Sequence, residues 1–78
     1  MLTPSEIERA IVLQLLSDEH HTRWSYSELT LVLADLPPAD VREAILRLDA
    51  DGVLERRGER IWASRPTRRL DELALIAV

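Results

Sequence analysis

The sequence predicts a mainly α-helical domain that carries one small β-hairpin. Two segments with apolar residues at helical spacing meet at Pro37-Pro38, and the second segment ends at Gly52. Two short runs of strand-forming residues then flank Gly58-Glu59, which suits a hairpin turn. The 78 residues make one domain, close to the lower size limit for a single hydrophobic core. We therefore expect a three-helix core, a short strand, a two-stranded hairpin and a C-terminal helical segment.

The first helix is expected to run from Thr3 to about Asp18. Thr3 suits the N-cap, Pro4 fits the first helical position, and Glu6 completes a capping box with Thr3. Apolar residues cover most of the helix circumference: Ile7, Ile11 and Leu15 share one stripe, and Val12, Leu13 and Leu16 point elsewhere. One stripe suffices for the core of the domain, so the rest of this helix needs another apolar partner.

A polar link and a short strand follow the first helix. The link contains Asp18-Glu19-His20-His21, the one cluster in the sequence with metal-binding residue types. Two adjacent histidines do not readily share one tetrahedral ion, so we interpret the cluster as a cap for the exposed carbonyls of the helix and predict no metal. Arg23-Trp24-Ser25 is expected to form the strand, with Trp24 beside the hairpin strand that carries Ile61 and Trp62.

The second helix is expected between an N-cap at Ser25 or Ser27 and a stop at Pro37-Pro38. Glu28 lies in its first turn, where an acidic side chain is favourable. The helix must end before Pro37, because proline disfavours helical geometry in the residue that precedes it. Its inner face is predicted to hold Leu29, Val32, Leu33 and Leu36.

The third helix is expected to begin at Pro38 and to stop at Gly52, since glycine is favoured just after a helix end. Its predicted buried stripe holds Val41, Ala44, Ile45 and Leu48. Beyond it, segments 53–57 and 60–64 are expected to pair as two strands. Gly58 can adopt the positive φ that a type II′ turn requires between them.

The end of the chain is expected to hold a helical segment that serves as a dimerisation element. Arg65-Pro66-Thr67 should end the hairpin, which divides the chain into a domain at 1–66 and a C-terminal segment at 67–78. The predicted dimer interface consists of Leu13, Leu70, Leu73, Ala74 and Ala77. The alternative is that this segment folds back onto the first helix of its own chain and completes a monomeric core.

Charge is divided unevenly along the chain. Residues 1–52 hold four arginines and ten acids, a net charge of −6, whereas residues 53–69 hold six arginines and two acids, a net charge of +4. All ten basic residues of the chain are arginine, whose guanidinium binds phosphate and carboxylate in a bidentate manner better than lysine does. A basic segment on an acidic body is an asymmetry typical of proteins that bind a charged partner.

From Ser27 to Trp62 the chain resembles the winged helix-turn-helix family of prokaryotic transcriptional regulators. Glu28-Leu29 match the start of the second helix in that family, and Leu48-x-x-x-Gly52-Val53-Leu54 match the approach to the wing, which is the hairpin. Val41, Ile45 and Leu48 match the residues that hold the recognition helix against the core. The resemblance implies a winged-helix fold and a double-stranded DNA partner.

The resemblance also implies a set of DNA-binding arginines. Arg42 and Arg47 on the third helix would contact the groove, and Arg56, Arg57, Arg60 and Arg65 would bind phosphates. The third helix departs from the family because Asp40, Glu43 and Leu46 stand among the outward positions that DNA-binding relatives fill with polar or basic residues. A second interpretation is that the hairpin arginines only keep an exposed hairpin in solution and pair with acids of the helices.

The alternative to DNA binding is a winged-helix module for protein–protein contact. Leu31 and Leu46 both fall outside the inner stripes of their helices, and two exposed leucines on one face favour a protein partner. The acidic balance of the helices favours this hypothesis, whereas the arginine-rich hairpin favours DNA.

Other classes of function lack the residues they need. The chain has no cysteine, no glycine-rich phosphate loop and no pairing of a nucleophile with a base, so we expect neither an enzyme nor a cofactor. No apolar run reaches the roughly 18 residues that span a bilayer. The N-terminal residues lack the basic stretch of a signal peptide, so the expected location is cytoplasmic.

Overall fold

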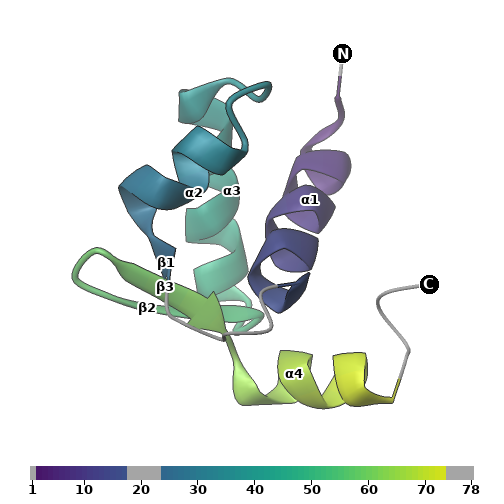
Figure 1. Cartoon of the computed structure of the whole chain (residues 1–78). Coiled ribbons are helices and arrows are strands. Elements are labelled where there is room, and N and C mark those ends of the chain that lie inside the picture. The colour runs from purple at the N-terminus through teal and green to yellow at the C-terminus, as the bar shows by residue number, and fades with distance from the viewer. Residues whose placement is uncertain (1, 18–23, 74–78) are drawn as a thin grey trace.

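The computed structural model describes residues 2–17 and 24–73, which form a mostly helical domain with a three-stranded antiparallel sheet (Figure 1). The helices α1, α2 and α3 pack together on one side of the sheet, and α4 extends from the end of β3. In chain order the elements are α1 (Pro4–Ser17), β1 (Trp24–Ser25), α2 (Tyr26–Val32), α3 (Pro38–Ala50), β2 (Leu54–Arg57), β3 (Arg60–Ala63) and α4 (Arg65–Glu72).

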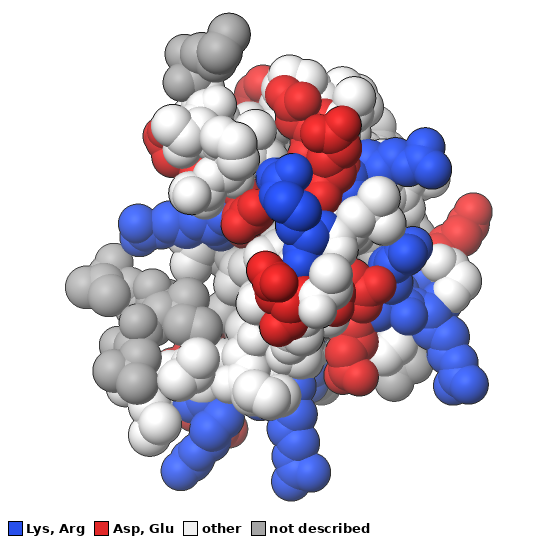
Figure 2. Space-filling model, turned by 180° about the vertical axis from the view of Figure 1, so that it is seen from behind, with Lys and Arg blue, Asp and Glu red and all other residues white. Residues whose placement is uncertain are grey.

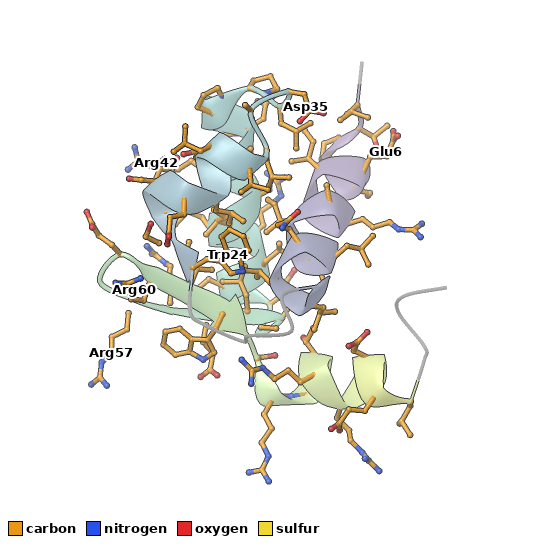
Figure 3. The ribbon with its side chains drawn as sticks, viewed as in Figure 1. Glu6, Trp24, Asp35, Arg42, Arg57 and Arg60 are labelled. Carbon is orange, nitrogen blue, oxygen red and sulfur yellow. The ribbon has the colours of Figure 1, made fainter. Side chains whose placement is uncertain are left out.

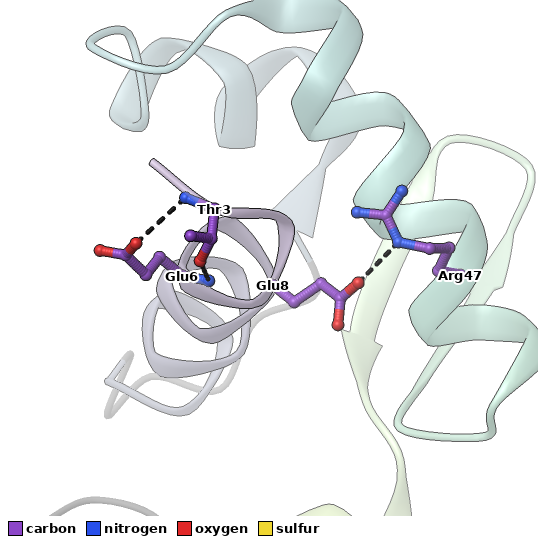
Figure 4. A network of polar contacts seen from close by, with 4 residues as sticks. All are labelled: Thr3, Glu6, Glu8 and Arg47. Carbon is purple, nitrogen blue, oxygen red and sulfur yellow. Dashed lines mark hydrogen bonds and ion pairs between the residues drawn. The ribbon is translucent and has the colours of Figure 1, made fainter. Parts of the chain in front are cut away.

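The predicted capping box at the start of α1 is confirmed (Figure 4). The Thr3 amide donates to Glu6 Oε1 at 3.0 Å, and the Glu6 amide donates to Thr3 Oγ1 at 3.2 Å. Bonding to the backbone of Thr3, and secondarily to its side chain, lowers the pKa of the Glu6 carboxyl. The helix continues to Ser17, and the predicted cap at Asp18-Glu19-His20-His21 lies outside the described residues.

The start of α2 also has a capping box. Ser25 is the N-cap, its hydroxyl accepts from the Glu28 amide at 3.1 Å, and its own amide donates to Glu28 Oε1 at 2.9 Å. Bonding to Ser25 is the main cause that lowers the pKa of the Glu28 carboxyl, and the charge of Arg60 adds to it. Of the two predicted N-caps, Ser25 is therefore the one used.

The end of α2 differs from the prediction. The helix stops at Val32 instead of continuing toward Pro37, and Leu33 is its C-cap. A turn follows in which the Leu36 amide donates to the Leu33 carbonyl at 2.9 Å. Leu36 is still buried because this turn carries it into the core, but Val32 is 48% exposed, so the prediction that Val32 faces inward was wrong. Proline disfavours helical geometry only in the residue directly before it, Leu36, so the end of the helix at Val32 belongs to the turn from Leu33 to Leu36 and not to Pro37 alone.

Helix α3 agrees with its prediction at both ends. It begins at Pro38, and its buried side chains are Val41, Ala44, Ile45 and Leu48. Gly52 follows the helix with φ +76°, a left-handed conformation that favours glycine. The Val53 amide then donates to the Leu48 carbonyl at 2.9 Å and closes the end of the helix.

The sheet has the strand order β1-β3-β2, with every neighbouring pair antiparallel. Trp24 is opposite Ile61, which confirms the predicted neighbour of Trp24. Gly58, with φ +60°, begins the two-residue turn between β2 and β3. One face of the hairpin closes the core, and the residues that it contributes are Leu54, Ile61 and Ala63.

Helix α4 begins two residues earlier than predicted. Ser64 is its N-cap, and Arg65-Pro66-Thr67 forms its first turn instead of a break in the chain. Proline is tolerated in the first turn because the amide that it lacks has no intrahelical acceptor there. Thr67 Oγ1 donates to the Val53 carbonyl at 2.6 Å, and the Ser64 amide donates to the same carbonyl at 3.1 Å. These two bonds tie the start of α4 to the residue just before β2.

Candidate nucleic-acid interface

Tyr26 of α2 lies beside Arg42 and Leu46 of α3 on the outward side of the domain, and we call these three residues the central ridge. All three side chains line two separate hollows, one of about 340 Å³ toward the hairpin and one of about 530 Å³ toward the start of α3. Residues that line both hollows lie between them. Arg42 and Leu46 are four residues apart and therefore share one face of the helix.

The hollow toward the hairpin has an apolar floor and a charged rim. Ile45 and Ile61 are nearly fully buried and form the floor beside Leu46. Arg56 and Glu59 stand on the hairpin side of this hollow. An elongated anionic ligand in this hollow would contact Arg42 of α3 and Arg56 of β2, and it would also face the Glu59 carboxylate.

Three of the six predicted DNA-binding arginines are held by carboxylates of the domain itself. Arg47 Nε is 2.6 Å from Glu8 Oε2 on α1, so its side chain is directed to the junction of α3 and α1 (Figure 4). Arg56 Nε lies 3.0 Å from Asp49 Oδ2 of α3. Arg60 and Glu28 make a looser and more exposed contact of 3.9 Å.

Arg42 and Arg57 make no ion pair with any of the described residues. Both are exposed, and with Arg60 they lie on the side of the molecule where the hairpin turns (Figure 3). Arg57 is directly opposite Arg60 in the hairpin, so two like charges stand side by side near the turn. The structure thus brings Arg42, Arg57 and Arg60 to one side of the domain.

Arg65 is separated from these arginines. It is the first residue of α4, which leaves the end of β3 farthest from the Gly58-Glu59 turn. Around it lies another shallow hollow, lined by Arg65, Pro66, Arg68, Arg69 and Glu72. Arg69 pairs with Glu72 at 3.5 Å. The six predicted arginines therefore form no single surface.

The face behind the view of Figure 1 is mixed in charge (Figure 2). Acidic side chains gather over its middle around one basic side chain, and further arginines project from its left, lower and right margins. Two acids border the central ridge, because Glu43 lines the hollow at the start of α3 and Glu59 lines the one at the hairpin. Both carboxylates oppose the approach of phosphate.

Exposed apolar residues accompany the ridge. Leu31 is 75% exposed and Leu46 is 42% exposed, which agrees with their predicted outward positions. Leu46 lines both hollows, whereas Leu31 lines neither. Sequence reasoning missed the role of Tyr26, the first residue of α2. No local sequence pattern indicated it, because the first turn of α2 lies beside α3 only in the folded chain.

The predicted dimer residues are accessible where the structure describes them. Leu70 of α4 is exposed, and Leu73, the C-cap of α4, is 51% exposed. Leu13 is half-buried on α1. Ala74 and Ala77 lie outside the described residues.

The described part of the chain contains no group of three or more His, Cys, Asp or Glu side chains placed to hold a metal ion. Within residues 2–17 and 24–73, no helix is long and apolar enough to cross a membrane.

Comparisons with known proteins leave the family open. The chain matches no protein-family model, no curated protein and no solved structure.

Proposed function

We propose that this protein is a small winged-helix DNA-binding protein that acts as a transcriptional regulator. The observation that carries the proposal is the central ridge of Tyr26, Arg42 and Leu46, which stands between two hollows and beside an arginine-bearing hairpin. The sequence of elements and the strand order β1-β3-β2 are consistent with the winged-helix resemblance of residues 27–62.

The shape of this side of the domain suits duplex DNA. The major groove is about 12 Å wide and admits an α-helix, so α3 enters with its ridge toward the base edges. The sugar–phosphate strands on either side of the groove then lie beside the two hollows, each of which also presents one carboxylate, Glu43 or Glu59, that weakens the contact. The hairpin turn reaches the neighbouring backbone, where Arg57 and Arg60 neutralise phosphates.

The contact set is smaller than the sequence predicted. We leave Arg47 out of this set because its guanidinium pairs with Glu8 at the junction with α1, and Arg65 because it lies beyond the far end of β3. Arg56 takes part only when it leaves Asp49. Arg42 and Arg57 therefore provide most of the contacts, and Arg60 joins them when it leaves its loose, exposed contact of 3.9 Å with Glu28.

The proposal is tested with a labelled mixed-sequence duplex of about 20 bp, titrated at several salt concentrations between about 50 and 200 mM. Each phosphate contact contributes about 0.9 to the slope of log affinity against log salt. Changing Arg57 to Gln should lower this slope by about one, and changing Arg56, Arg57 and Arg60 together should lower it by up to roughly three.

Arg47→Gln is the matched control, because it removes the same charge from a position that does not face the DNA. It should leave the salt slope unchanged. Equal effects of Arg47→Gln and Arg57→Gln would show that only net charge matters and would refute the proposed surface. Absence of duplex binding even at the lowest salt would refute DNA binding altogether.

The second candidate is a module for protein–protein contact, and the exposure of Leu31 favours it. A leucine exposed by three-quarters on α2, beside an exposed Val32, is not explained by the DNA hypothesis. In this function Leu31 and Leu46 provide the apolar contacts. The duplex titration separates the candidates, because a protein-contact module of this acidic charge should show no salt-dependent duplex affinity.

The active form in the proposed function is a homodimer. Leu70 of α4 and its C-cap Leu73 are exposed, and together with Leu13 of α1 they offer apolar surface to a second copy. A symmetric dimer would present two α3 helices to half-sites about 34 Å apart, one helical turn of DNA.

A further inference from the structure

We propose that Arg42 and Leu46 act together as a base-reading pair that selects a guanine and a thymine in close succession. This inference rests on the proposed DNA binding and specifies which bases the same surface prefers. It starts from the side chains that α3 presents on the central ridge, Arg42 and Leu46, and from the different chemistry of the two.

Arg42 is the hydrogen-bond donor of the pair. It forms no ion pair with any described residue, unlike Arg47 on the same helix, so its guanidinium is free to bind a ligand. In the major groove, guanine presents two acceptors, O6 and N7, that match the paired donors of a guanidinium. Arginine on guanine is the commonest specific contact of this kind.

Leu46 is the apolar member of the pair. Its side chain stands between the two hollows and keeps 42% of its surface exposed, so it has area left to bury against a ligand. The one apolar group on the major-groove edge of DNA is the 5-methyl group of thymine. A leucine on a surface that enters this groove therefore favours thymine, because it buries its apolar side chain against the methyl group.

The spacing of the two residues sets the spacing of the two bases. Four residues along an α-helix correspond to a rise of about 6 Å. Successive bases of a DNA strand are about 3.4 Å apart along the axis. Arg42 and Leu46 therefore reach base pairs no more than about two steps apart. A sequence in which guanine and thymine alternate offers both groups in every register.

The test compares chemically altered duplexes of one sequence. The reference probe is an alternating guanine–thymine strand of about 20 nucleotides paired with its adenine–cytosine complement. The second probe replaces every thymine by deoxyuridine, which removes only the methyl group. The third replaces every guanine by 7-deazaguanine, which removes the N7 acceptor. Affinity for each is measured at one salt concentration, so that the phosphate contribution stays constant.

The wild-type protein should bind the reference about fourfold more tightly than the deoxyuridine probe, as expected for one methyl-sized apolar contact. Leu46→Ala should bind these two probes equally. It should still prefer guanine over 7-deazaguanine, by about tenfold. Arg42→Ala should show the opposite pattern, with the methyl preference kept and the preference for guanine lost. Leu31→Ala is the control, because it removes a more exposed leucine that lines neither hollow and should change nothing.

The failures of the two proposals are distinct. If the wild-type protein binds all three probes equally and with a normal salt slope, the base-reading pair is refuted and DNA binding stands. If Leu31→Ala abolishes the methyl preference as Leu46→Ala does, the ridge is not the surface that reads bases. If no probe binds at any salt concentration, the proposed DNA function fails and the base-reading pair fails with it.

Discussion

Helices α3 and α4 both carry a proline in the first turn, but different forces hold them in place. Four apolar side chains of α3 are buried in the core. Among the described residues of α4 only Thr67 is buried, and hydrogen bonds to the Val53 carbonyl fix its start. Apolar packing therefore fixes the surface that α3 presents, whereas the position of α4 depends on a few polar atoms.

The sharpest test of this difference is a leucine truncation in each helix. Leu48→Ala in α3 should destabilise the domain by about 2–5 kcal/mol, because it leaves a cavity among close-packed side chains. Leu70→Ala in α4 should change the free energy of unfolding by less than about 0.5 kcal/mol, since its side chain is 43% exposed. Urea denaturation measures both, at a protein concentration low enough to keep any dimer dissociated. Similar losses would mean that α4 has a share in the core.

The polar attachment of α4 is tested at Thr67. Thr67→Val preserves the shape of the side chain but removes the hydroxyl that donates to the Val53 carbonyl. A loss of about 1–3 kcal/mol is expected, because Ser64 Oγ also loses the acceptor to which it donates. Thr67→Ser keeps the hydroxyl and should recover most of the loss in the same denaturation experiment. If Thr67→Ser is as unstable as Thr67→Val, the methyl group and not the hydrogen bond stabilises this site.

The outer face of α4 is tested by the mass of the protein in solution. Leu73→Glu should leave the free energy of unfolding of a monomer within about 0.5 kcal/mol, because the residue is exposed. In the proposed dimer it should halve the mass measured by sedimentation and leave the helical circular dichroism unchanged. A wild-type species near the chain mass of 8.9 kDa at micromolar concentration would refute the dimer.

The smallest expected effect is on the free energy of unfolding at acidic pH. The pKa values of Glu6 and Glu28 are lower in the folded protein than in the unfolded chain. Both carboxylates therefore stabilise the fold at pH values above the unfolded-state pKa of glutamate, about 4.3. This stabilisation is lost as the pH falls through the lowered folded-state values. Glu6→Gln and Glu28→Gln should flatten the stability curve in that range, because glutamine keeps the capping bond without titrating. Glu72→Gln in α4, for which no capping bond exists among the described residues, is the control. An identical flattening by Glu72→Gln would contradict the role of the two caps.

The parts of the fold that the sequence predicted well depend on local interactions. The predicted capping box of Thr3 and Glu6 joins residues only three positions apart, as does the N-cap bond of Ser25, which was one of two predicted N-caps, and Gly52 and Gly58 have the positive φ expected of glycine at a helix end and a hairpin turn. The end of α2 was mispredicted because Leu36 reaches the core through a turn, and the helical pattern that includes it therefore continues past the true helix end. The start of α4 was mispredicted because Pro66 is compatible with a first turn as well as with a break.

The candidate site was less predictable because its contacts are long-range. Arg47 and Glu8 are 39 residues apart in the sequence, and no spacing rule predicts their ion pair. The outward positions of Arg42 and Leu46 followed from the helical pattern. That Tyr26 lies beside them, and that hollows flank all three, depends on how α2 and the hairpin pack against α3.

The position of β2 at the edge of the sheet has a consequence for solubility. An uncovered edge strand offers unpaired amides and carbonyls to any other extended chain, and charged side chains are a common protection against such aggregation. Three of the four residues of β2 are charged: Glu55, Arg56 and Arg57. Arg57, which contacts phosphate in the proposed function, and its neighbour Arg56 are therefore also residues that keep hairpins of separate molecules from joining into a continuous sheet. Replacing both with apolar side chains would promote aggregation before any loss of affinity could be measured.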